Sequence, residues 1–204
     1  MKLSILKYLA PVTFLVAGSA SAQMIGQFND SSSINFQYDF GGASINSFAT
    51  FQEITVPSGG GVGNADFGTI DISGSDTLLI RAQLLSTNVA SVFEFAIFNA
   101  DDTVKTKWDI PTNLFNTETM TTVALSFTDA YAIQNEPPFG ATSVIFSDVA
   151  KFQIGEGFDN NGGALGLRME FAEAVVIPEP ATTAAVAAVL VLMCVGFRRR
   201  RARC

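Results

Sequence analysis

Short runs of alternating apolar and polar residues are the feature that most constrains how this chain folds. In Thr77 to Leu85 the side chains of Ile80, Ala82 and Leu84 share one face, and their polar neighbours point the other way. A period of two is typical of a half-buried β-strand. The same period recurs in Ser91 to Asn99, Val104 to Ile110, Val123 to Phe127 and Leu165 to Phe171.

One apolar face per strand means that the sheets must stack in order to bury those faces. No stretch between Gln23 and Ile177 has a sustained helical period. The pattern therefore predicts an all-β, antiparallel two-sheet β-sandwich of the jelly-roll type, with a hairpin turn at Asn99 to Asp102 and a glycine-rich loop at Pro57 to Gly63. Weaker strand patterns lie at Ile34 to Phe40, Phe51 to Val56, Ser143 to Phe146 and Val149 to Ile154.

The N-terminal residues 1–22 have the pattern of a signal peptide. Two lysines precede a short apolar run from Leu9 to Gly18, and the small residues Ala20 and Ala22 form an A-x-A cleavage site. We expect signal peptidase to cut before Gln23. The alternative is an uncleaved N-terminal anchor, which the short apolar run disfavours.

The C-terminal residues 178–204 form a second segment that does not belong to the sandwich. Ala181 to Phe197 carries no charge over 17 residues, which is the lower limit for a transmembrane helix. A basic tail, residues 198–204, follows and predicts a stop in the inner membrane with the arginines on the cytoplasmic side. A buried core helix is the alternative. The arginines are Arg198, Arg199, Arg200, Arg201 and Arg203.

The triplet Pro178, Glu179 and Pro180, followed by the apolar helix and the arginines, resembles the PEP-CTERM sorting signal. That signal occurs in secreted proteins of Gram-negative bacteria that make extracellular polysaccharide. The resemblance implies cleavage by an exosortase, so that the protein is membrane-anchored before processing and then reaches the cell surface or extracellular matrix. An ordinary single-pass membrane protein with a proline-containing linker is the alternative.

A second resemblance lies inside the sandwich. The segment Asp71 to Leu78 reads D-x-S-G-x-D-x-L and resembles the entry to a central strand of galactose-binding-like jelly rolls. The similarity extends loosely from Phe67 to Val176. This group includes many non-catalytic carbohydrate-binding modules, so the resemblance implies a jelly roll and a carbohydrate ligand.

Charge and composition exclude several kinds of chemistry. The span from Asp30 to Glu179 holds all nineteen acidic residues against five basic ones, a net charge of −14. Such a segment repels nucleic acid. The chain has no histidine, and its two cysteines are Cys194 in the apolar segment and Cys204 in the basic tail. Ser-His-Asp triads, Cys-His pairs and the common zinc sites are therefore excluded from the sandwich, while a Ser-Lys dyad stays formally open.

Carboxylates leave two further possibilities. A glycoside hydrolase needs only two acids at a set separation, but we expect the acids to be solvated in turns or on polar strand faces. The acids concerned are Asp101, Asp102 and Asp159 in turns, and Glu94, Asp109 and Glu170 on strands. No cofactor is expected. A structural calcium ion is a speculative alternative, with Asp30, Asp159 and Glu173 as the oxygen donors to consider.

Sugar binding requires exposed aromatic rings, and the sequence offers few of the usual ones. Trp108, Tyr38 and Tyr131 are the natural candidates, and we consider Trp108 and Tyr131 possible ligand contacts. Core packing is the alternative for Trp108, because it shares a face with Ile110. We expect an exported, non-catalytic envelope or matrix protein that associates with extracellular polysaccharide. A structural or adhesive surface protein without a sugar site, or a secreted glycoside hydrolase, is the alternative.

Overall fold

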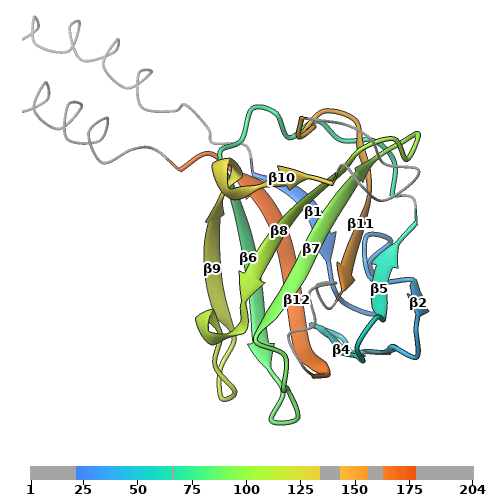
Figure 1. Cartoon of the computed structure of the whole chain (residues 1–204), viewed down its shortest axis with the longest axis vertical. Helices are drawn as coiled ribbons and strands as arrows, with labels where there is room; N and C mark the ends of the chain where they lie inside the picture. The colour runs from blue at the N-terminus through green and yellow to red at the C-terminus, as the bar shows by residue number, and fades with distance from the viewer. Residues whose placement is uncertain (1–21, 66, 134–142, 156–162, 178–204) are drawn as a thin grey trace, which may run out of the picture.

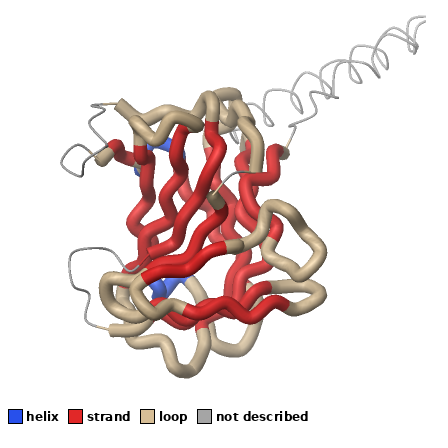
Figure 2. Tube along the Cα trace, turned by 90° about the vertical axis from the view of Figure 1, so that its right-hand side faces the viewer, coloured by secondary structure: helices blue, strands red, loops and turns tan. Residues whose placement is uncertain are grey.

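The computed structural model describes residues 22–65, 67–133, 143–155 and 163–177, and these form two antiparallel β-sheets packed face to face (Figure 1). The all-β sandwich that the alternation predicts is therefore confirmed. Strands dominate the described chain, with short helical turns between some of them (Figure 2). The expected sorting signal and residues 1–21 of the expected signal peptide lie outside the described residues. Within the part of the chain described here, no helix has the length and apolar character to cross a membrane.

Sheet A is built around one long strand at its centre. This strand, β12, pairs with β6 along one side, and on its other side it pairs first with β4 and then, beyond a register shift after Met169, with β1. The order is β3-β4-β12-β6-β9 with β1 beside β12. The strands are β1 (Gln23–Gln27), β3 (Ser44–Ser47), β4 (Gln52–Val56), β6 (Thr77–Leu84), β9 (Thr121–Ser126) and β12 (Leu165–Val175).

Sheet B has the order β10-β8-β7-β11-β5-β2, and each neighbouring pair is antiparallel. Its strands are β2 (Tyr38–Phe40), β5 (Gly61–Asn64), β7 (Val92–Asn99), β8 (Lys105–Pro111), β10 (Tyr131–Ala132) and β11 (Val149–Gly155). Two 3-10 turns, η2 (Thr112–Leu114) and η3 (Phe127–Asp129), follow β8 and β9.

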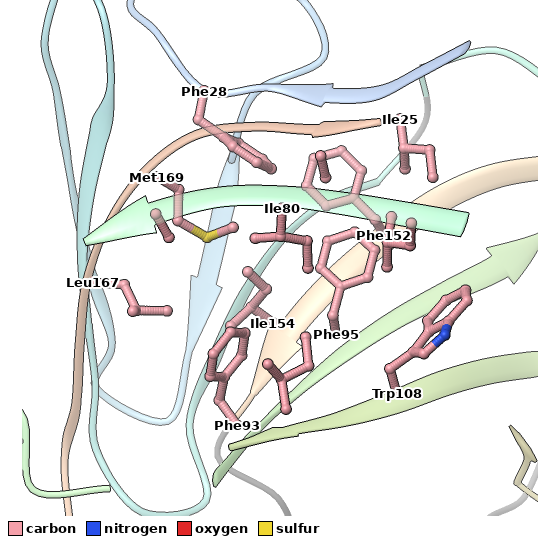
Figure 3. Packing of buried hydrophobic residues seen from close by; sticks show 14 of the residues in the cluster. Ile25, Phe28, Ile80, Phe93, Phe95, Trp108, Phe152, Ile154, Leu167 and Met169 are labelled. Atoms are coloured by element: carbon pink, nitrogen blue, oxygen red, sulfur yellow. The ribbon is translucent and has the colours of Figure 1, made fainter. Parts of the chain in front are cut away.

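An aromatic core fills the space between the sheets. The rings of Phe28 and Phe36 stack with centroids 4.3 Å apart, and Phe152 packs against both edge-on at 5.6 Å. Phe95 and Trp108 extend this core, with ring centroids 6.3 Å apart (Figure 3). Stacked and edge-to-face rings of this kind bury large apolar area with favourable pair geometry, which lets the sandwich form a core without disulfides.

Most of the strand predictions are confirmed, including the alternation in β6 and the hairpin between β7 and β8. Of the weaker ones, one is confirmed only in part and another is wrong. Only Tyr38–Phe40 of the Ile34 to Phe40 run is a strand, and Ser143 to Phe146 is not one. The sequence pattern also misses β1 and β3.

The prediction of a glycine-rich loop at Pro57 to Gly63 is also wrong for the second half of that range. Gly61–Asn64 forms the buried strand β5 between β11 and β2. A Cβ on Gly61 would clash with the ring of Phe40, and one on Gly63 would lie 2.5 Å from the Tyr38 hydroxyl. The glycines are therefore needed so that neighbouring rings can lie against the strand, which is a different reason from flexibility.

Candidate functional site on the outer face of sheet B

The side of sheet B that points away from sheet A carries a continuous set of aromatic, small and charged residues. We call it the outer face. Its residues alternate with core residues such as Phe95, Phe152 and Trp108, which point inward. The strand register places two neighbouring rows on it. One row is Tyr38, Gly63, Gln153, Ala96, Lys107 and Tyr131, and the next is Phe40, Gly61, Gly155, Glu94 and Asp109.

Aromatic rings stand at both edges of the outer face. Tyr38 and Phe40 lie on the β2 edge with centroids 6.5 Å apart and planes 24° from parallel. Tyr131 lies on the opposite edge, in β10, and both Tyr131 and Phe40 are 40% exposed. The sequence alone indicates Tyr38 and Tyr131 as candidates but not Phe40, whose place on this face depends on the unpredicted strand β5.

A buried charged cluster lies between these edges. The carboxylate of Glu94 accepts from Lys105 Nζ at 2.8 Å and from Lys107 Nζ at 2.6 Å. The side chains of Glu94, Lys105 and Lys107 are only 3%, 4% and 9% exposed. We expected a solvated polar strand face here, and the structure contradicts that for Glu94. Two neighbouring lysines satisfy its carboxylate, which is what makes burial of the charge tolerable.

Lys107 connects the buried cluster to the exposed edge. Its ammonium lies 3.4 Å from Asp109 Oδ1 and 5.0 Å from the ring centre of Tyr131. Tyr131 donates its hydroxyl to Asp109. Burial lowers the pKa of Lys107, but hydrogen bonds with Glu94 and Tyr131 and the nearby carboxylate charges outweigh it, so the pKa lies above its ordinary value. Lys107 is thus a permanent cation at neutral pH.

A third lysine lies near the Tyr38 edge. Lys151 Nζ contacts Asp102 Oδ2 at 2.5 Å, and Asp102 lies in the β7–β8 turn with a φ of 56°. Asp102 N–H donates to the Asn99 carbonyl oxygen at 3.2 Å, which fixes this turn. Burial, followed by the charge of Asp102, raises the pKa of Tyr38. The phenol of Tyr38 is therefore a neutral hydrogen-bonding group at physiological pH.

Trp108 occupies the core and not the outer face. Its side chain is 1% exposed, its Nε1–H donates to the Ser126 carbonyl oxygen at 3.0 Å, and its ring packs against Phe127. A ring enclosed in this way cannot stack on a sugar from solvent. The prediction that Trp108 contacts a ligand is therefore wrong. Trp108 packs in the core, which was the alternative that the sequence left open.

The speculative calcium donors do not come together where the structure describes them. Strands β1 and β12 do pair, but antiparallel register sets Glu173 opposite Met24, six residues before Asp30 along the chain. Asp30 instead lies past the β1 end, where its N–H donates to Phe48 O. Asp159 lies outside the described residues. Among the residues described, no group of three or more acidic or thiol side chains is placed to hold a metal ion.

Comparisons with known proteins identify the fold and no family. No protein-family model matches the chain, and no curated protein matches it. Among solved structures, a family 11 carbohydrate-binding module of the Clostridium thermocellum cellulase Lic26A-Cel5E is similar at 12% identity and a TM-score of 0.55, over 79% of this chain and 98% of that one. The module from the same organism in complex with a β-1,3-1,4-mixed-linked tetrasaccharide gives 13% identity, a TM-score of 0.54, and coverage of 78% and 97%.

An agarase, AgWH50C, is also similar, at 12% identity and a TM-score of 0.51, over 76% of this chain and 26% of that one. The likeness is thus to a part of the agarase. At these identities, the comparisons show that the described chain has the jelly-roll sandwich fold of carbohydrate-binding modules.

Proposed function

We propose that this chain is an exported, non-catalytic protein that binds extracellular polysaccharide through the outer face of sheet B. The observation that carries the proposal is the placement of Tyr38 and Phe40 at one edge of this face and Tyr131 at the other, with polar side chains between them. The exposed rings stand at the two ends of a row of Cα partners that crosses six strands, so a ligand that touches both edges would be an extended polymer and not a single sugar.

The chemistry of the face matches what a sugar chain requires. Aromatic rings stack on the apolar faces of pyranose rings, and fixed polar groups bond the hydroxyls. Tyr131 is held by Asp109, so its ring is pre-ordered before a ligand arrives. Gln153 and Lys151 lie between the edges on β11 and can supply amide and ammonium groups. Pre-ordered groups lose little entropy on binding.

The same geometry argues against a hydrolase. Glu94 and Asp109 are Cα partners, so their carboxylates lie on neighbouring strands of this surface. Both approach the ammonium of Lys107, at 2.6 Å and 3.4 Å. A glycosidase needs one carboxylic acid that carries a proton, whereas Glu94 accepts a hydrogen bond from the Lys107 ammonium and Asp109 forms an ion pair with the same cation. The proposed role is therefore binding.

The sorting signals belong to the proposal as well. We propose signal peptidase and an exosortase as processing partners, with anchoring in the inner membrane before cleavage and the cell surface or matrix afterwards. The strand boundaries support this division. Strand β1 begins at Gln23, the first residue after the expected cleavage, and β12 ends at Val175, before Pro178. Gln23 and Ala174 are Cα partners, so the start of β1 and the end of β12 lie side by side in sheet A.

Polysaccharide retention by the purified full-length chain tests the binding function. Tyr131→Ala and Tyr38→Ala should each weaken retention on a bound polysaccharide by about tenfold, from the loss of about 1–3 kcal/mol of ring contact. Phe48→Ala is the matched control, because Phe48 is 44% exposed but follows β3 in sheet A. Equal effects of all three substitutions, or no retention on any polysaccharide, would remove the proposal and favour a structural or adhesive role.

Mass spectrometry of the protein recovered from its own cells tests the processing. The expected product begins at Gln23 and lacks the arginine tail. A product that still ends at Cys204 contradicts exosortase cleavage without affecting the binding assay.

A further inference from the structure

Every basic side chain of the sandwich is paired with a carboxylate. The five lysines and arginines between Asp30 and Glu179 all lie among the described residues. The ion pairs are Arg81–Glu170 at 2.7 Å, Lys105–Glu94 at 2.8 Å, Lys107–Glu94 at 2.6 Å, Lys151–Asp102 at 2.5 Å and Arg168–Glu53 at 2.9 Å. A sulfate, phosphate or uronate group that approaches any of these cations therefore meets a carboxylate beside it, which repels the anion.

The pairing is concentrated on the proposed binding face. All three lysines of the sandwich lie there, and the carboxylates of Glu94, Asp102 and Asp109 stand against them, so the cluster is close to neutral. The surrounding chain is strongly acidic, with a net charge of −14 from Asp30 to Glu179. A field of that sign slows the approach of a polyanion and raises its cost of binding.

Resting on the proposed function, we infer that the outer face of sheet B binds uncharged polysaccharide and discriminates against anionic polysaccharide, with Asp102 as a residue that determines this selectivity. The reason for choosing Asp102 is exposure. Lys105 and Lys107 are 4% and 9% exposed, whereas Lys151 is 27% exposed. Lys151 is thus the lysine that a polymer on this face can reach, and Asp102 is the group that neutralises it.

The fold positions Asp102 for this role through the β7–β8 turn. Asp102 has a positive φ of 56°, a conformation that non-glycine residues other than Asn and Asp seldom adopt. The turn is held by the Asp102 N–H, which donates to Asn99 O, and by the Asn99 side chain, which accepts from the N–H of Val104 at 2.8 Å. The carboxylate is therefore delivered to Lys151 by a fixed turn and does not depend on a mobile side chain alone.

Pairs of polymers with one backbone and different charge test the inference. Suitable pairs are hydroxyethyl cellulose against carboxymethyl cellulose, and dextran against dextran sulfate. Each polymer is cast into a native polyacrylamide gel, in which binding slows the migration of the protein. The full chain is used with its five tail arginines replaced by glutamine, so that the tail does not attract the anionic polymer. We expect retardation by a neutral member that exceeds that of its anionic partner by about tenfold or more in affinity at about 20 mM salt.

Two variants assign the selectivity to the outer face. Asp102→Asn releases the ammonium of Lys151 and should raise affinity for the anionic polymer by about fivefold, an effect that about 0.5 M salt removes. Glu170→Gln is the matched control: it removes the same charge, but it releases Arg81 on sheet A, whose side chain is 37% exposed. We expect no gain from it.

The outcomes separate this inference from the proposed function. Wild-type binding that is equal for both members of a pair, or stronger for the anionic one, overturns the selectivity and leaves polysaccharide binding in place. Equal gains from Asp102→Asn and Glu170→Gln overturn the assignment to Asp102. Retardation by none of the polymers overturns the proposed function itself.

Discussion

The outer faces of the two sheets use ion pairs in different ways. On sheet A, Arg81 pairs with Glu170 and Arg168 with Glu53, and these four side chains are between 25% and 41% exposed. On sheet B, Glu94 and its two lysines are at most 9% exposed. Half-exposed pairs contribute little to stability, whereas a buried carboxylate must keep its partners or become costly. The sheet A face is a solvated surface, and the sheet B face is a pre-ordered one.

The aromatic residues follow the same division. Tyr38, Phe40 and Tyr131 lie across the outer face of sheet B, at opposite edges. On sheet A, Phe51 stacks on Phe48 at 4.7 Å and its ring lies 5.5 Å from the Arg168 guanidinium, so these rings occupy one corner. The candidate ligand contacts therefore lie on the outer face of sheet B, which is also the face that holds the buried charged cluster.

Removal of the Glu94 charge should give the largest effect. Glu94→Gln leaves the ammonium groups of Lys105 and Lys107 buried side by side without a carboxylate between them. We expect a loss of about 3–5 kcal/mol in the free energy of unfolding, measured by urea denaturation at neutral pH. Glu170→Gln makes the same change in the exposed pair of sheet A and should cost at most about 1 kcal/mol. If the two losses are similar, the contrast between the faces is incorrect.

A smaller effect is expected from the glycines that underlie the aromatic rings. A Cβ at Gly63 would lie 2.5 Å from the Tyr38 hydroxyl and 2.6 Å from the Phe152 carbonyl oxygen, whereas one at Gly155 meets no atom of the described residues closer than 3.5 Å. Gly63→Ala should cost about 1–3 kcal/mol by overpacking and weaken polysaccharide retention by moving Tyr38. Gly155→Ala, on the same face, should be close to neutral in both assays. Equal tolerance at the two sites would show that the rings are not held by these glycines.

These two faces also show what the sequence can and cannot predict. Alternation identified β6 and β12 because each has one buried and one solvated side, as Ile80 and Arg81 illustrate. It misassigned Glu94 because the outer face of β7 is buried as well, so the polar residue there is paired and not solvated. The hairpin at Asn99 to Asp102 could have predicted this pairing, because its register sets Glu94 opposite Asp109, two residues from Lys107.

Strand β5 was beyond the reach of the same reasoning. A run of glycines predicts a loop from composition, and only the tertiary contact with Tyr38 and Phe40 explains why Gly61 and Gly63 are needed in a strand. Two of the three rings on the candidate site depend on that strand, because β2 joins sheet B through β5. The candidate site was therefore less predictable than the fold.

Alkaline pH should separate the faces through the chemistry of their cations. The raised pKa of Lys107 means that its contribution to stability is complete below the ordinary value of 10.5 and is lost as pH rises through the higher folded-state pKa. Arginine stays charged throughout this range, so the sheet A pairs do not respond. We expect the free energy of unfolding to be level from about pH 7 to 10 and to fall above that. In Lys107→Met the alkaline fall should be smaller, and an unchanged profile would contradict the assignment.

Ionisation of Tyr131 should give the smallest and most local signal. Burial and then the hydrogen bond to Asp109 raise its pKa above 10.0, although Lys107 acts in the opposite direction. Absorbance of phenolate during titration, compared with Tyr131→Phe to isolate this residue, should show ionisation above pH 10. Asp109→Asn removes the anionic acceptor and leaves the charge of Lys107, so the pKa should fall. A value that does not move, or that rises, would mean that Asp109 does not hold the Tyr131 ring in place, and the pre-ordered edge of sheet B would lose its physical basis.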